Sequence, residues 1–81
     1  MTKQEFNKLT LAQKGDLCWS DGEYINWVQY NEQKALLFLV RSHYVEMYYS
    51  TKDKIVSSIE ILENPTRLVH YAQSVDILDA Y

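Results

Sequence analysis

Glycine, proline and cysteine are scarce in this sequence, and their scarcity excludes several kinds of site. The 81 residues include two glycines, one proline and one cysteine. Dinucleotide- and phosphate-binding loops need closely spaced glycines, which Gly15 and Gly22 do not supply. Cys18 alone supports no disulfide framework, thiolate zinc site or redox pair. We therefore expect no metal, no cofactor and few special loops in which to build a catalytic site.

Positive charge is also limited. The sequence has eight Lys and Arg residues and eleven Asp and Glu residues, which gives a net charge of −3. Binding to nucleic acid is therefore not expected. The first residues lack the basic-then-apolar order of a signal peptide, and the longest apolar run, 35–40, is too short to span a membrane. We therefore expect a cytoplasmic protein without a membrane partner.

Helix signals stand at the start of the chain. Thr2 with Glu5 and Thr10 with Gln13 have the spacing of capping boxes. They predict a short helix over 3–8 and a longer one over 11–20, the latter ended by Asp21-Gly22 as a left-handed cap. The 3–4 spacing then predicts a buried side on the second helix, made by Leu11, Gly15, Cys18 and Trp19.

From residue 23 onward the apolar residues alternate with a period of two, which predicts strands over 24–30, 34–40, 44–49 and 55–61. The breaks between these segments are too short for parallel crossovers, so the strands should form an antiparallel meander. Asn64-Pro65 is typical of a helix start and predicts a C-terminal helix, with a last short turn from Asp76. The predicted fold is a single α+β domain over 1–81.

The strand register decides which side chains share a face. We predict pairing of Trp27 with Phe38, Leu37 with Met47, and Tyr49 with Ile55. One face is then mainly aliphatic and should carry the helices as the core. Its apolar members are Val28, Tyr30, Ala35, Leu37, Leu39, Val45, Met47, Tyr49, Ile55, Ile59 and Ile61.

The opposite face is predicted to be unusually apolar for a solvated surface, with Ile25, Trp27, Leu36, Phe38, Val40, Tyr44, Tyr48 and Val56. Left bare, it would exceed the apolar patch that monomers usually tolerate. Either the C-terminal helix covers it or a second copy does, and we favour the second copy. Trp27, Phe38, Tyr44 and Tyr48 would then anchor a homodimer or another protein partner. Glu46 would accept a tyrosine hydroxyl or hold a basic partner.

The sequence offers no convincing catalytic group. His43 is expected in a turn, His70 on the outward side of the last helix beside Arg67, and Cys18 among core residues. We therefore expect a small interaction or accessory module that is not an enzyme and self-associates through the aromatic face. The alternative is a small-ligand-binding domain, with a pocket between this face and the C-terminal helix that uses Glu46 and a tyrosine hydroxyl.

One stretch carries a resemblance. The segment Tyr44-Val45-Glu46-Met47-Tyr48-Tyr49, followed by Lys54-Ile55-Val56, resembles a hairpin in a group of short uncharacterised bacterial proteins. The outline of that group, a capped N-terminal helix and a C-terminal helix, is similar over 10–22 and 71–78. The resemblance implies a bacterial α+β protein and assigns no activity or site residue.

Overall fold

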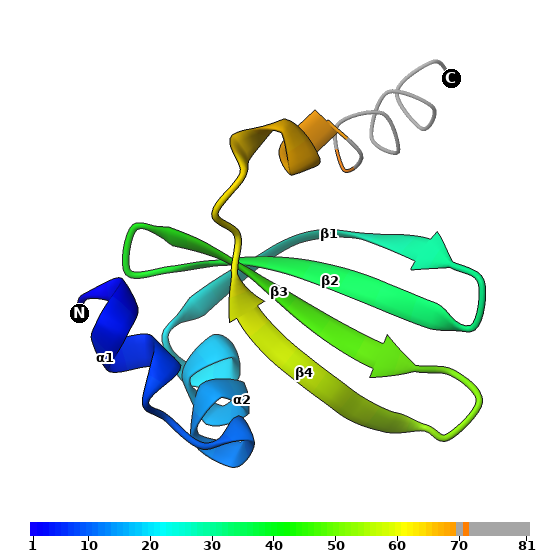
Figure 1. The fold of residues 1–81 in the computed structure, drawn as a ribbon, viewed down its shortest axis with the longest axis horizontal. Helices are drawn as coiled ribbons and strands as arrows, with labels where there is room; N and C mark the ends of the chain where they lie inside the picture. Colours follow the sequence, from blue (N-terminus) through cyan, green and yellow to red (C-terminus); the bar gives the residue numbers. More distant parts are fainter. Residues whose placement is uncertain (70, 72–81) are drawn as a thin grey trace.

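The computed structural model describes residues 1–69 and 71 and contains one four-stranded sheet with two N-terminal helices (Figure 1). Helices α1 (Lys3–Asn7) and α2 (Leu11–Ser20) begin at the two threonines predicted to cap them. In each capping box the threonine hydroxyl oxygen accepts a hydrogen bond of 3.1 Å from the backbone N–H three residues later. The side chain at that position accepts one from the threonine N–H in return. Both predicted helices are therefore confirmed, with their first N–H groups satisfied.

The end of α2 differs from the prediction. Asp21 is the C-cap with a right-handed backbone, Gly22 is already the first residue of the sheet, and neither glycine has a positive φ. Gly22 is needed for space, because a Cβ there would overlap the carbonyl oxygen of Cys18. The predicted left-handed cap is therefore wrong, and the glycine permits close packing of the strand against the helix end.

The four strands are antiparallel and lie in sequence order, as predicted. They are β1 (Gly22–Tyr30), β2 (Gln33–Val40), β3 (His43–Ser50) and β4 (Ile55–Ile61). Their turns contain no glycine; the residues with positive φ are Asn31, Arg41, Ser42 and Lys54. Tight hairpin turns need positive φ angles to match the twist of the flanking strands. Asn31 adopts such an angle readily, whereas Arg41, Ser42 and Lys54 are less favourable residues for it.

The register between β2 and β3 differs from the prediction by one residue. Pairing Leu37 with Met47 supposed a longer loop, whereas the loop consists of Arg41 and Ser42 alone, so that Leu37 lies opposite Glu46. Since side chains alternate along a strand, this shift moves every β3 side chain to the other face relative to β2. The predicted partners in the outer pairs are also wrong: Trp27 lies opposite Leu36, and Tyr49 lies opposite Val56 beside a bulge.

The correct register gives the sheet a helix-side face that carries the main core. Phe6 of α1 and Cys18 of α2 pack there against buried strand residues, namely Phe38, Val40, Val45, Met47 and Ile59. Burial raises the pKa of the Cys18 thiol to about 11, so the group is a neutral thiol at physiological pH. The prediction that Cys18 is a core residue is confirmed. The N-terminal helices cover the part of this face nearest the N-terminus (Figure 1).

We call the opposite face of the sheet the C-terminal face. It carries Ala35, Leu37, Tyr44, Glu46 and Tyr48. The chain after β4 crosses to it and forms a 3-10 turn, Pro65–Arg67, whose N-cap is Asn64. Leu68 and Tyr71 then pack against Ala35 and Leu37, which are buried. Asn64 is the cap, as predicted, but Pro65–Arg67 form a 3-10 turn where the first turn of an α-helix was predicted. The predicted C-terminal helix itself is not shown, because His70 and residues 72–81, with the last turn from Asp76, lie outside the described residues. The chain itself therefore covers part of the C-terminal face, whereas the predicted apolar face does not exist as one surface.

Candidate functional site

The five residues predicted to form one binding surface lie on two opposite faces. Trp27 and Phe38 are on the helix-side face, whereas Tyr44, Glu46 and Tyr48 are on the C-terminal face. Phe38 is 1% exposed and Glu46 is 4% exposed, so neither presents itself to solvent. The one-residue register shift explains the split, because it exchanges the faces of β3 relative to β1 and β2.

Glu46 is the centre of a polar cluster on the C-terminal face. Arg67 donates to both carboxylate oxygens, from Nε at 3.1 Å and from Nη2 at 3.1 Å. The hydroxyls of Tyr48 and Tyr71 donate to the same carboxylate at 3.0 and 2.8 Å. The predicted tyrosine bond is therefore confirmed, and the cation comes from the chain's own Arg67. With its oxygens occupied in this way, Glu46 fastens the segment after β4 to the sheet.

Arg67 was expected to point outward from a helix, and this expectation is wrong. The 3-10 turn over Pro65–Arg67 has three residues per turn, so its side chains emerge in directions different from those of an α-helix. The side chain of Arg67 consequently reaches Glu46 and Tyr48 on the sheet. The acidic side chain in an otherwise apolar strand was the signal in the sequence that a cation must lie nearby.

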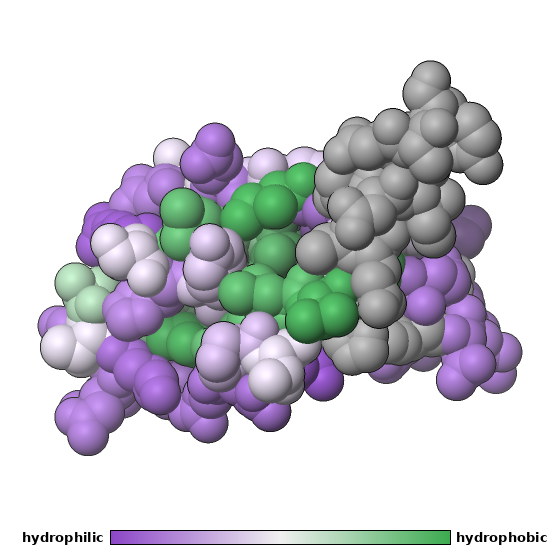
Figure 2. Space-filling view, turned by 90° about the horizontal axis from the view of Figure 1, so that it is seen from above, coloured by the Kyte–Doolittle hydropathy of each residue, from purple (hydrophilic) through white to green (hydrophobic). Residues whose placement is uncertain are grey.

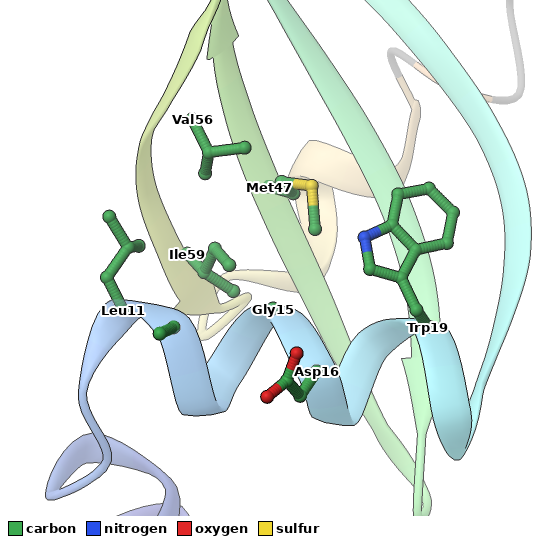
Figure 3. A pocket seen from close by; sticks show the side chains of 8 residues that line it. Leu11, Gly15, Asp16, Trp19, Met47, Val56 and Ile59 are labelled. Carbon is green, nitrogen blue, oxygen red and sulfur yellow. The ribbon is translucent and has the colours of Figure 1, made fainter.

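An open apolar groove runs along the helix-side face where α2 leaves the sheet uncovered (Figure 3). Its first part has a volume of about 390 Å³ and lies between α2 and strands β3 and β4, lined by Leu11, Gly15, Trp19, Met47, Val56 and Ile59. A second part of about 360 Å³ shares Trp19, Met47 and Val56 and adds Lys34, Leu36 and Tyr49. We call these two adjoining parts the tryptophan groove.

Trp19 forms the wall shared by both parts of the groove. Its side chain is 66% exposed, although the helical spacing predicted that it would be buried with Cys18. One side of the ring rests edge-to-face on the buried ring of Phe38, with centroids 5.1 Å apart and an interplanar angle of 85°. Trp19 is therefore a large exposed side chain that is held in one orientation by the core.

Opposite charges stand at the two parts of the tryptophan groove. Asp16 on α2 is the charged residue among the described residues that line the first part, and Lys34 on β2 is the charged residue among those lining the second. The Lys34 ammonium lies 4.6 Å from the centroid of the Trp27 ring, which holds it at the end of the groove formed by β2. The groove thus has an apolar floor between an acidic and a basic end.

Hydrophobic surface is also visible on the side of the molecule away from α2 (Figure 2). There, however, the chain already supplies cover: Leu68 and Tyr71 pack on the sheet, and Asn26 Nδ2 donates to the Tyr71 carbonyl oxygen at 3.0 Å. The tryptophan groove has two exposed tryptophans beside it and no such cover from the described residues. It is therefore the better candidate for a functional surface.

The described residues give little support for other kinds of site. His43 was predicted in a turn, but it is the first residue of β3 and half-buried, with Nε2 3.1 Å from the Met1 carbonyl oxygen. Within residues 1–69 and 71, no group of three or more His, Cys, Asp or Glu side chains is placed to hold a metal ion. In the same range, no helix has the length and apolar character needed to cross a membrane.

Comparison of the chain with protein-family models, curated proteins and solved structures finds no match.

Proposed function

We propose that this protein is a small cytoplasmic interaction module, without catalytic activity, that self-associates through the tryptophan groove. The observation that carries the proposal is Trp19, which is 66% exposed yet fixed against Phe38. Exposed aromatic side chains that need no reordering on binding lose little entropy, and tryptophan is enriched among the residues that dominate interface energies. Trp27, 42% exposed on the same face, enlarges the surface.

The groove suits a second copy of the chain because it carries one acidic and one basic end. A surface with both signs complements itself when the second copy is turned around, as in the common two-fold dimers. A standard interface buries about 800 Å² per partner, roughly one-seventh of the 5564 Å² surface. The groove with Trp27 and its apolar lining, including the exposed Leu11, offers a surface on which such an interface can form.

Small-ligand binding at Glu46, the alternative predicted from the sequence, has less support. That carboxylate is bonded to Arg67, Tyr48 and Tyr71, so a ligand would first have to displace the chain's own groups. The open tryptophan groove also lacks converging polar groups that would orient a small molecule.

Sedimentation equilibrium tests the proposal. We expect the wild type to be dimeric at tens of micromolar and Trp19→Ser to be a folded monomer at the same concentration, with association at least about tenfold weaker. Tyr44→Ser is the matched control, since it removes an aromatic side chain that is 39% exposed on the C-terminal face. A monomeric wild type, or equal dimerisation of wild type and Trp19→Ser, would overturn the proposal.

A further inference from the structure

We infer that Asp16 and Lys34 are the specificity-determining residues of the dimer and that each pairs with the other residue on the second copy. The inference rests on the proposed self-association and goes beyond it by assigning the orientation of the two chains. It identifies which polar groups select a second copy over other apolar surfaces.

The groove has an acidic end and a basic end, with Trp19 between them. Trp19 lines both parts, Asp16 lines the part over α2 and Lys34 lines the part over β2. Trp19 therefore lies between the acidic and the basic end. A two-fold axis that lies in the interface beside Trp19, perpendicular to the groove, exchanges these ends, so that each Asp16 meets the Lys34 of the other copy.

Both charged groups are free to form an ion pair across an interface. Asp16 is exposed on α2 at the edge of the groove (Figure 3), and no ion pair within the described part of the chain engages it. Lys34 likewise has no carboxylate partner among the described residues and is held over the indole of Trp27. Two neighbouring acid–base pairs on the sheet and helices, Arg41 with Asp21 and Lys3 with Glu63, are by contrast already satisfied.

The two charges make one orientation of the dimer more favourable than the other. A two-fold dimer contains the Asp16–Lys34 contact twice, so one substitution changes two contacts. When the two grooves run antiparallel, each Asp16 lies opposite a Lys34. When they run parallel, Asp16 would lie opposite Asp16 and Lys34 opposite Lys34. Like charges placed together at an interface are strongly unfavourable, so these two residues select the antiparallel arrangement.

A charge-swap mixing experiment tests this inference. Asp16→Lys and Lys34→Asp are each expected to weaken self-association by about tenfold or more, because each places like charges opposite one another twice. An equimolar mixture of the two variants should form heterodimers with nearly wild-type affinity, because both contacts then join unlike charges. Native mass spectrometry identifies the heterodimer by its mass, and sedimentation equilibrium gives the affinity.

Two control variants make the same changes in net charge away from the groove. Glu60→Lys lies on a strand position opposite Glu46, on the C-terminal face, and Lys8→Asp lies at the end of α1. Both should dimerise like the wild type, and circular dichroism should show all four variants folded.

The outcomes separate the inference from the proposed function. If the wild type dimerises and the two charge variants dimerise equally well, the pairing is wrong and the groove remains the interface. If each variant is weakened and the mixture does not recover, the antiparallel pairing is also wrong. If the wild type is monomeric, both the pairing and the proposed self-association fail.

Discussion

Phe38→Ala is expected to lower the free energy of unfolding by about 3–5 kcal/mol, the usual cost of removing a buried aromatic side chain. Phe38 is 1% exposed. Its ring packs edge-to-face with the rings of Trp19 and Tyr24, with centroids 5.1 and 5.7 Å apart. Its removal leaves a cavity in the main core and takes away the support on which Trp19 rests. The variant should therefore lose stability and also present a less ordered groove.

Urea denaturation at a protein concentration of about 1 μM measures this effect on the monomer. Tyr44→Ala is the control, because a residue 39% exposed on the other face should change stability much less. The sequence alone placed Phe38 in an interface, where its loss would weaken association and leave monomer stability nearly unchanged. That result would contradict the core position described above.

Glu46→Gln is expected to lower the free energy of unfolding by about 1–3 kcal/mol. The substitution keeps the size of the side chain but removes the charge that Arg67, Tyr48 and Tyr71 address. The range stays modest because the Arg67 side chain is 38% exposed, so that solvent screens its part of the interaction. Urea denaturation again provides the measurement.

Glu60→Gln provides the matched control for this prediction. Glu60 lies directly opposite Glu46 in the β3–β4 register but is exposed, so its neutralisation should change stability by less than about 0.5 kcal/mol. Similar losses for the two variants would mean that the polar cluster does not hold the segment after β4 to the sheet.

The helix starts and the strand order could be predicted because their signals are local. Each threonine cap lies three residues from its partner, as in Thr10 with Gln13, and the short breaks between strands leave only antiparallel pairing. Asn64 before Pro65 is a signal of the same kind. In all these cases a few neighbouring residues determine the structure.

The register could not be predicted in this way, because it depends on the length of one loop. Arg41 and Ser42 both adopt positive φ, of 46° and 74°, although neither residue favours it. An Asn-Gly pair would have marked a two-residue turn, whereas Arg-Ser-His gave no such signal. A single extra residue in the supposed loop was enough to exchange the faces of β3 and to merge residues from both sides into one apparent patch.

The exposure of Trp19 also could not be predicted from the spacing of apolar residues in the sequence. Its neighbour Cys18 is fully buried, and both residues belong to the apolar stripe of a ten-residue helix. Helical spacing gives the direction of a side chain, but it does not say how far the sheet extends beneath the helix. Because α2 covers only part of the face, Trp19 lies at the margin of the cover and becomes the wall of a groove.

The central claim is that the helix-side face, through the tryptophan groove, is where the protein associates. A concentration series of ¹H–¹⁵N NMR spectra from about 10 μM to about 1 mM tests it most directly, because the chain has two tryptophans and hence two indole N–H signals. The account predicts that the indole signals of Trp19 and Trp27 shift with concentration, together with the amides of Asp16 and Lys34, while the amide of Tyr44 stays in place. Unchanged indole signals, or shifts confined to Tyr44 and its neighbours on the C-terminal face, would contradict it.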